Sequence, residues 1–291
     1  MLYTLKNNKL AVEVSDLGAE LRSFKSSDGT EYLWQGDPAF WSGRSPNLFP
    51  YIGRMINKQY EYDGKTYTMD IHGFAASSVF EVVEHSDTLL VMRLNSNEET
   101  KKRYPWDFRF SIFYKLINQR LDICFKVENL SNSTMLFAVG GHPGFCVPLC
   151  DGERFEDYRL RFPAPGRTYR VTFTSDCFVD SDDTEYYLDG NNCIPLRHDL
   201  FDEDAIVLRG AGDSVILESV KSNRAVEVRF PQMEYIGFWH MPKMDAPYVC
   251  IEPWTSLPSA KGEKTVLESQ RDLLRLEAGG EYSNTWSVLA K

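Results

Sequence analysis

The stretch from Phe108 to Val127, FRFSIFYKLINQRLDICFKV, decides the fold class of this chain. In its second half, Leu121, Ile123, Phe125 and Val127 alternate with polar or smaller residues. Alternation with a period of two is the pattern of a β-strand that buries one face and exposes the other. The stretch therefore predicts β structure.

Two strands and a turn account for this stretch. The runs 108–116 and 120–127 are both strand-like, and the link Ile117-Asn118-Gln119 between them is short and mostly polar. Short polar links between two alternating runs are typical of β-hairpins. We therefore predict an antiparallel hairpin.

Outward from the hairpin, the same alternation recurs along the whole chain, whereas helical periodicity is scarce. Further strands are predicted at 10–14, 89–94, 158–162, 215–220, 225–230, 235–240, 248–252 and 286–289. Helical turns are predicted only at 37–41 and 266–274. The alternation of strands with long helices that βαβ units require is absent, and no repeat or low-complexity linker divides the chain. The sequence thus predicts one all-β domain over residues 1–291, a large β-sandwich.

Composition narrows the possible partners and location. The 291 residues are 43% hydrophobic and carry a formal net charge of −10, so nucleic acid and anionic membranes are poor partners. The first residues lack the apolar core of a secretory signal, and no apolar run is long enough to span a membrane. We therefore expect a cytoplasmic protein. Its six cysteines form no CxxC pair, and we expect reduced thiols, at least four of them in the core.

Two of the five histidines lie beside glycines. His72 precedes Gly73, and His142 lies in the segment GGHPGF, residues 140–145. Glycine lets the backbone turn sharply and leaves the neighbouring imidazole facing open space, and histidine is the side chain best suited to exchange protons near neutral pH. Each histidine could instead satisfy a loop carbonyl, an alternative that is stronger for His72 than for His142.

Four further residues are candidates for a site. Glu252 follows a run of apolar residues and precedes Pro253, which is expected to end the strand; a carboxylate there needs a partner or a function. Trp254 suits stacking on a sugar face or a place in the core. Asp204 lies in an acidic segment that could be a solvated loop. Arg54 could bind sugar hydroxyls or neutralise Glu252 or Asp204.

Several chemistries are excluded by missing motifs. The chain has no phosphate-binding loop, no dinucleotide-binding glycine motif, no GxSxG elbow and no HExxH zinc motif. His72, His142 and Glu252 could ligate a metal, but they lie far apart in sequence without recognisable ligand spacing. We therefore predict neither a metal nor another cofactor.

Together these segments resemble the aldose 1-epimerase superfamily, and within it the LacX-like branch. The resemblance rests on five segments in the family's order: Gly53-Arg54, HGF at 72–74, GGHPGF at 140–145, DAIVL at 204–208 and CIEPW at 250–254. It implies a β-supersandwich with a site in a groove across one sheet. By resemblance, Glu252 is the general base, His142 the general acid, and His72 a ligand of the ring-oxygen side. Asp204, or alternatively Asp202, binds sugar hydroxyls, as does Arg54.

One position departs from the family pattern. Galactose mutarotases usually have a second arginine after Gly53-Arg54, and Lys58 stands in its place here. Since that arginine contacts the sugar in better-known members, the resemblance does not extend to galactose as the substrate.

The residue types fit the interconversion of α and β anomers of a hexose. A base removes the proton of the C1 hydroxyl, an acid protonates the ring oxygen, and the ring opens, rotates and closes on its other face. With base and acid on opposite sides of the ring, we expect Glu252 and His142 to be separated by roughly 5–9 Å. We also expect nearby acids to keep His142 protonated.

Other functions remain open at this stage. A non-catalytic carbohydrate-binding protein would keep the groove without turnover. A hexose-6-phosphate mutarotase would need a cluster of cations, for which only Arg44 and Arg54 stand out. A glycoside hydrolase could use Glu252 and Asp204 as its two carboxylates, but then the two glycine-flanked histidines would have no role.

Overall fold

A computed structural model describes residues 1–291, and the central hairpin is present in it as predicted. Strands β9 (Phe108–Ile117) and β10 (Arg120–Asn129) pair over their full length, from Ile117 opposite Arg120 to Phe108 opposite Asn129. The turn residue Asn118 has a φ of 52°, a left-handed conformation that asparagine tolerates better than most residues. Alternate residues of β10 are buried, as a strand with one core-facing side requires.

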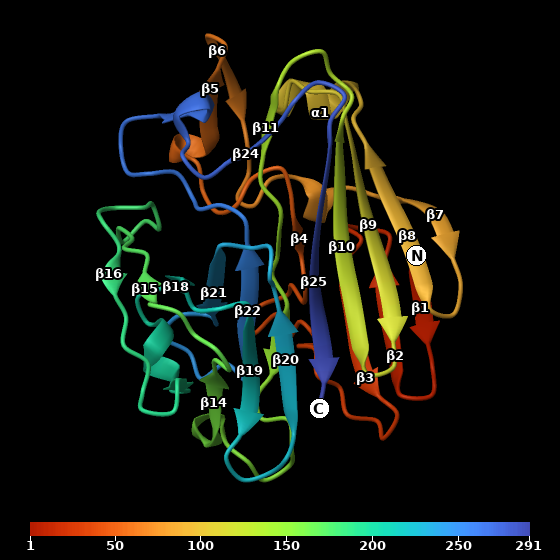
Figure 1. Ribbon diagram of the computed structural model, residues 1–291, viewed down its shortest axis with the longest axis vertical. Helices are drawn as coiled ribbons and strands as arrows, with labels where there is room; N and C mark the ends of the chain where they lie inside the picture. Colours follow the sequence, from red (N-terminus) through yellow and green to blue (C-terminus); the bar gives the residue numbers. More distant parts are fainter.

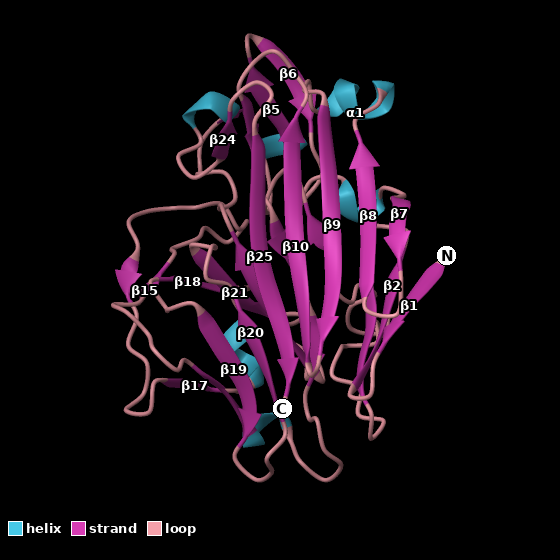
Figure 2. Ribbon diagram, turned by 45° about the vertical axis from the view of Figure 1, so that its right-hand side comes forward, coloured by secondary structure: helices cyan, strands magenta, loops and turns pink.

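The hairpin lies inside a nine-stranded antiparallel sheet. Its other strands are β7 (Glu81–His85), β8 (Leu89–Asn95), β14 (Tyr158–Arg161), β17 (Cys193–Pro195), β19 (Ser214–Ser219), β20 (Ala225–Arg229) and β25 (Glu281–Ala290). The order is β17-β14-β19-β20-β25-β10-β9-β8-β7. Figures 1 and 2 show the long strands β25, β10, β9 and β8 side by side along the molecule.

A second sheet of eight strands carries the candidate site. Its strands are β4 (Asn47–Leu48), β12 (Gly140–Gly141), β13 (Gly144–Cys146), β15 (Tyr169–Arg170), β16 (Thr184–Glu185), β18 (Ile206–Arg209), β21 (Tyr235–Trp239) and β22 (Tyr248–Trp254). They follow the order β16-β15-β18-β21-β22-β12-β4, and β13 also pairs with β22. Strand β22 is therefore the centre of this sheet.

Small sheets and short helical pieces complete the fold. The remaining strands are β1 (Leu2–Lys6), β2 (Leu10–Ser15), β3 (Leu21–Ser26), β5 (Gln59–Tyr62), β6 (Lys65–Thr68), β11 (Met135–Phe137), β23 (Thr265–Val266) and β24 (Leu274–Leu276). The helix α1 (Glu98–Arg103) was not predicted; it begins at Asn97, whose side chain accepts hydrogen bonds from the first-turn amides. Single 3₁₀ turns occur at Ile56–Lys58, Ala75–Ser77, Phe155–Asp157, His198–Phe201 and Leu267–Ser269.

The two large sheets share one core. A single cluster of 70 buried apolar residues contains side chains from both; for example, Phe49 next to β4 stacks on Phe110 of β9 with ring centroids 4.5 Å apart. Burial of apolar surface between sheets is the main stabilising term of such a sandwich. The all-β class predicted from the sequence is confirmed, and no helix is long and apolar enough to cross a membrane. The cytoplasmic location stays a prediction.

Three local predictions were wrong or only partly right. Residues 37–41 form a turn, in which the amides of Phe40 and Trp41 both donate to the carbonyl of Asp37, rather than a helical piece. The helix at 266–274 shrinks to the 3₁₀ turn Leu267–Ser269. Only two of the six cysteines are fully buried, the other four being partly exposed, and all six are free thiols.

Strand β22 does not end before Pro253 but continues through it to Trp254. The amides of Ile251 and Thr255, on either side, donate to the carbonyls of Pro143 and Val139. The N–H that Pro253 lacks falls between these two bonds, where the neighbouring chain passes from β12 to β13. A proline is tolerated in a strand at such an interruption because no ladder hydrogen bond is lost.

Candidate active site

The register of the second sheet brings His142 and Glu252 together. Gly140 lies opposite Trp254 and Gly144 lies opposite Cys250. His142, halfway between the two glycines, therefore lies opposite Glu252 across the strand pair. The Nε2 atom of His142 is 3.2 Å from Oε2 of Glu252.

This contact corrects the separation expected from the sequence. The expected gap of roughly 5–9 Å assumed that acid and base lie on opposite sides of a sugar ring. Directly opposed residues of an antiparallel pair have Cβ atoms only about 4.5–5.5 Å apart, so their polar ends meet. The two side chains form an adjacent pair at the floor of the site.

Burial disfavours charge on both members of this pair. Glu252 is only 2% exposed, and burial, followed by the nearby carboxylate of Asp204, raises its pKa well above the usual value. Burial, followed by coupling to the neighbouring imidazole of His72, lowers the pKa of His142 well below the usual value. The sequence analysis expected nearby acids to keep His142 protonated. The lowered pKa of His142 contradicts this expectation, because burial outweighs the effect of those acids. Both shifts favour the electrically neutral form of the pair, with the proton on Glu252, over the ion pair.

Aromatic rings fix the orientation of His142. The indole of Trp41 stacks on the imidazole with ring centroids 4.9 Å apart and planes 28° apart. Trp239, at the end of β21, meets the same imidazole edge-on at 5.8 Å. Nδ1 of His142 has no hydrogen-bond partner in the protein, so packing against the two indoles holds this side of the ring.

His72 is held in a single tautomer by the backbone of Gly53. The amide of His72 donates to the carbonyl of Gly53 (2.9 Å), and the amide of Gly53 donates to Nδ1 of His72 (3.1 Å). Since Nδ1 accepts, the proton of the neutral ring is on Nε2. Burial and the charge of Arg54 lower the pKa of His72 to about 4, so near neutral pH it is a neutral donor. Its φ of 64° is the sharp turn expected beside Gly73.

Asp204, and not Asp202, lies in the site. One carboxylate oxygen of Asp204 accepts from the amide of Ala205 (2.9 Å), and the other accepts from the thiol of Cys177 (2.9 Å). Burial and this carboxylate raise the pKa of Cys177 to about 12, so the thiol stays protonated and able to donate. Asp202 instead accepts from the amide of Lys243 (3.2 Å).

Arg54 lies at the edge of the site and Lys58 lies outside it. Nη1 of Arg54 donates to the carbonyl of Asp176 (3.0 Å), and Arg54 forms no ion pair with Glu252 or Asp204. Lys58 is an exposed surface residue that pairs with Asp70 at 3.8 Å. It therefore does not take the place of the second arginine that galactose mutarotases carry.

All six residues predicted from the sequence line one cavity of about 310 Å³, a size suited to a small molecule. They are Arg54, His72, His142, Asp204, Glu252 and Trp254. The indole N–H of Trp254 lies beside the carboxylate of Glu252, where it acts to lower the pKa of that group, but the two form no well-aligned hydrogen bond. Sequence reasoning missed several lining residues, among them Trp41, Phe173, Cys177, Glu203 and Trp239. Only the aromatic, acidic or thiol character of their side chains could have suggested them, because none lies in a distinctive motif.

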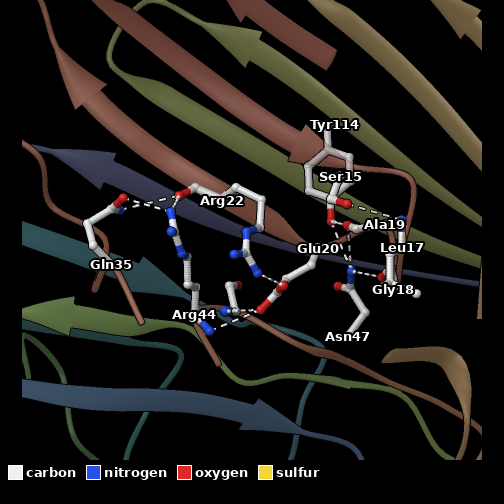
Figure 3. Close-up of polar contacts among 11 residues, drawn as sticks. Ser15, Leu17, Gly18, Ala19, Glu20, Arg22, Gln35, Arg44, Asn47 and Tyr114 are labelled. Carbon is white, nitrogen blue, oxygen red and sulfur yellow. Dashed lines mark hydrogen bonds and ion pairs between the residues drawn. The ribbon is translucent and has the colours of Figure 1, made fainter. Parts of the chain in front are cut away.

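A buried polar network supports the wall beside His142. Figure 3 shows Asn47 with its side-chain amide against the carbonyls of Gly18 (3.0 Å) and Ala19 (2.9 Å) and the hydroxyl of Tyr114 (3.0 Å). These contacts fix the segment before β4, where the carbonyl of Pro46 accepts from the amide of His142 (3.0 Å).

Arg44 belongs to the same network. Its Nη1 donates to the carbonyl of Arg22 (2.7 Å) and to Oε1 of Gln35 (2.7 Å), and its amide donates to Glu20 (3.0 Å) (Figure 3). The guanidinium is therefore engaged with the scaffold, and Arg44 does not line the cavity.

Comparison with known proteins places the chain in a family. The family described as aldose 1-epimerase matches residues 1–270. The chain belongs to the aldose 1-epimerase family. It is 32% identical over 284 residues to the chromosomal protein LacX of Lactococcus lactis subsp. lactis, with 95% of each chain covered. The resemblance to the LacX-like branch of this family is thereby confirmed.

Solved structures of family members have the same fold. A galactose mutarotase related enzyme from Lactobacillus acidophilus is 36% identical with a TM-score of 0.93, covering 100% of this chain and 97% of that one. A galactose mutarotase-like protein from Lactobacillus casei is 30% identical, also with a TM-score of 0.93, and both chains are covered completely. The predicted β-supersandwich of the mutarotase type is therefore confirmed.

Proposed function

We propose that this protein is an aldose 1-epimerase that interconverts the α and β anomers of a free hexose by acid–base ring opening. The observation that carries the proposal is the buried His142–Glu252 pair, 3.2 Å apart at the floor of a cavity of about 310 Å³. An acid and a base that share one proton are what the reaction needs, because it moves protons but consumes none.

The short distance between acid and base suits the reacting atoms. The C1 hydroxyl oxygen and the ring oxygen are bonded to the same carbon, so the two proton transfers take place side by side. In the ion-pair form, Glu252 accepts the C1 hydroxyl proton and His142 donates its proton to the ring oxygen. The bond between C1 and the ring oxygen breaks as the C1 carbonyl forms. After rotation about C1–C2, the same two transfers run in reverse and close the ring on its other face.

Other lining residues would hold the sugar. The Nε2–H of His72 is a donor for the ring-oxygen side, since its Nδ1 is occupied by Gly53. Asp204 can accept from hydroxyl groups remote from C1, and Arg54 can donate to them. The indoles of Trp41 and Trp254 offer apolar faces for the C–H groups of a pyranose.

The charge of the cavity favours an unphosphorylated sugar. Arg54 is its only lining arginine or lysine, whereas Glu203, Asp204 and Glu252 are three acids. Because Arg44 is engaged elsewhere, the cluster of cations that a sugar phosphate would need is absent from the cavity. A phosphate dianion placed there would be repelled by the carboxylates and poorly compensated.

We therefore expect kcat/KM for free hexoses to exceed that for the matching 6-phosphates by about tenfold or more, the effect of one uncompensated charge contact. Polarimetry of fresh α-anomer solutions over a panel of free and 6-phosphorylated hexoses measures this. Equal rates for both classes would contradict the charge argument. Sugar binding without faster mutarotation of any panel member would show instead a non-catalytic carbohydrate-binding protein.

Trp41 should matter because its ring sets the position of the acid. Trp41→Ala is expected to lower kcat/KM by roughly 10- to 100-fold, since small misplacements of a catalytic group cost that much. Trp41→Phe, which keeps a stacking ring, should retain most of the activity. The same polarimetric assay measures both variants. Equal losses in the two variants, or none in Trp41→Ala, would refute this role of the stacked ring.

A further inference from the structure

A thiol that the proposed reaction does not use lies against the catalytic pair. Cys250 is completely buried, and one ligand atom from each of His142, Cys250 and Glu252 lies within 4.8 Å of the other two. As whole residues, His142, Cys250 and Glu252 are 9%, 0% and 2% exposed, and the side chain of His142 alone is 11% exposed.

The sheet brings these three residues together by its register. Cys250 and Glu252 are two residues apart in β22 and so face the same side of the sheet. Gly144, opposite Cys250, has no side chain to fill the space, and a Cβ there would lie 3.5 Å from the sulfur. The cluster is thus built into the centre of the second sheet and does not depend on mobile surface side chains.

Two of the ligand-bearing residues have unused polar atoms. Nδ1 of His142 is buried and makes no hydrogen bond, and Oε2 of Glu252 has only its 3.2 Å contact with Nε2 of His142, which is not a well-formed hydrogen bond. Unpartnered buried polar atoms are rare in native proteins and often mark a place where an ion or ligand binds. Imidazole, thiolate and carboxylate are together the donor types that Zn²⁺ prefers.

We propose that His142, Cys250 and Glu252 form a three-ligand site for Zn²⁺ and related soft divalent cations, which block the catalytic pair. In a tetrahedral zinc site the ligand atoms are about 3.3–3.6 Å apart, as follows from the zinc–ligand bond lengths. His142 and Glu252 are already 3.2 Å apart, and the sulfur needs to move inward by about an ångström. His142 and Glu252 line the cavity, which gives the ion its path to them, whereas Cys250 does not line it.

Metal binding at this site excludes catalysis. A bound ion takes the lone pairs with which Glu252 and His142 exchange protons, and it displaces two protons to solvent, the thiol proton of Cys250 and the proton held by the pair. Sugar and metal therefore compete for the site. The inhibition rests on the proposed function, whereas the binding itself does not.

Binding is tested with Co²⁺, whose thiolate complexes have a charge-transfer absorption band. We expect the wild-type protein to show this band, Cys250→Ala to lose it, and Cys177→Ala and Cys193→Ala to keep it. The two controls remove the thiol beside Asp204 and the other fully buried thiol. A band that is absent from the wild type, or that persists in Cys250→Ala, would overturn the proposal.

Inhibition is tested with Zn²⁺ in the mutarotation assay. Cys250→Ala should keep its basal activity, which also shows that it is folded, and should need about tenfold or more Zn²⁺ for half-inhibition, as loss of a ligand predicts. Cys193→Ala should be inhibited like the wild type, and EDTA should restore full activity to both. Equal inhibition of Cys250→Ala, or loss of wild-type activity in EDTA alone, would refute an inhibitory site at Cys250. A protein that binds Co²⁺ through Cys250 but never accelerates mutarotation would refute the proposed function and leave the metal site standing.

Discussion

Glu252→Gln is expected to lower kcat/KM for mutarotation by about 10²- to 10⁴-fold, the contribution of one positioned base. Glutamine has nearly the same shape as glutamate, so the packing in β22 is retained, but it accepts no proton. Burial disfavours the charged form of Glu252 and so raises its pKa. A neutral glutamine at this position carries no such cost. The fold should therefore remain intact, and only the proton transfer from the C1 hydroxyl should be lost.

Polarimetry at several sugar concentrations measures this effect, with circular dichroism to confirm folding. Glu203→Gln is the matched control, because Glu203 lines the same cavity but is exposed and lies outside the His142–Glu252 pair. Its activity should stay within a few-fold of the wild type. If Glu252→Gln keeps more than about a tenth of wild-type kcat/KM, Glu252 is not the general base.

His142→Asn should cause a loss of the same size, about 10²- to 10⁴-fold, because it removes the acid that protonates the ring oxygen. Asparagine fits the space between Trp41 and Trp239 and can still form hydrogen bonds, but it cannot deliver a proton. His85→Asn is the control, since His85 is exposed, lies outside the cavity and contacts the carbonyl of Thr4 and the ring of Tyr3. It should retain full activity.

The double variant Glu252→Gln/His142→Asn gives a sharper test of the shared proton. Residues that act as a unit lose activity non-additively, so the double variant should be about as impaired as either single variant. A loss equal to the product of the two single losses would show that His142 and Glu252 act independently, which would contradict the paired mechanism.

Strand positions were predictable because burial on one face leaves a period of two in the sequence. All eight further strands predicted by alternation are present, with bounds that differ by only one or two residues in most cases. The strand β22 ran past its predicted end at Pro253, because a proline stops a strand only where a ladder bond would be lost. Whether such a bond exists depends on the neighbouring chain, which the local sequence does not reveal.

The identity of the site residues was also available from the sequence, but their surroundings were not. The segments GGHPGF and CIEPW carry His142 and Glu252, and the family resemblance named both. Trp41 and Trp239, which hold the imidazole, come from a turn and a strand end without any motif. Their contacts arise only when distant segments fold against each other.

The amino-acid sequence by itself determined the all-β class, the family and the six predicted lining residues, since each leaves a local pattern of hydrophobicity or a short motif. Tertiary structure alone decided the distances. The register that sets Gly140 against Trp254 and Gly144 against Cys250 places His142 within 3.2 Å of Glu252, and it brings the Cys250 thiol to the same point. Pairing register depends on hydrogen bonds and packing between segments more than a hundred residues apart, so no local pattern encodes it. It is this register that sets the acid and the base of the proposed mechanism side by side.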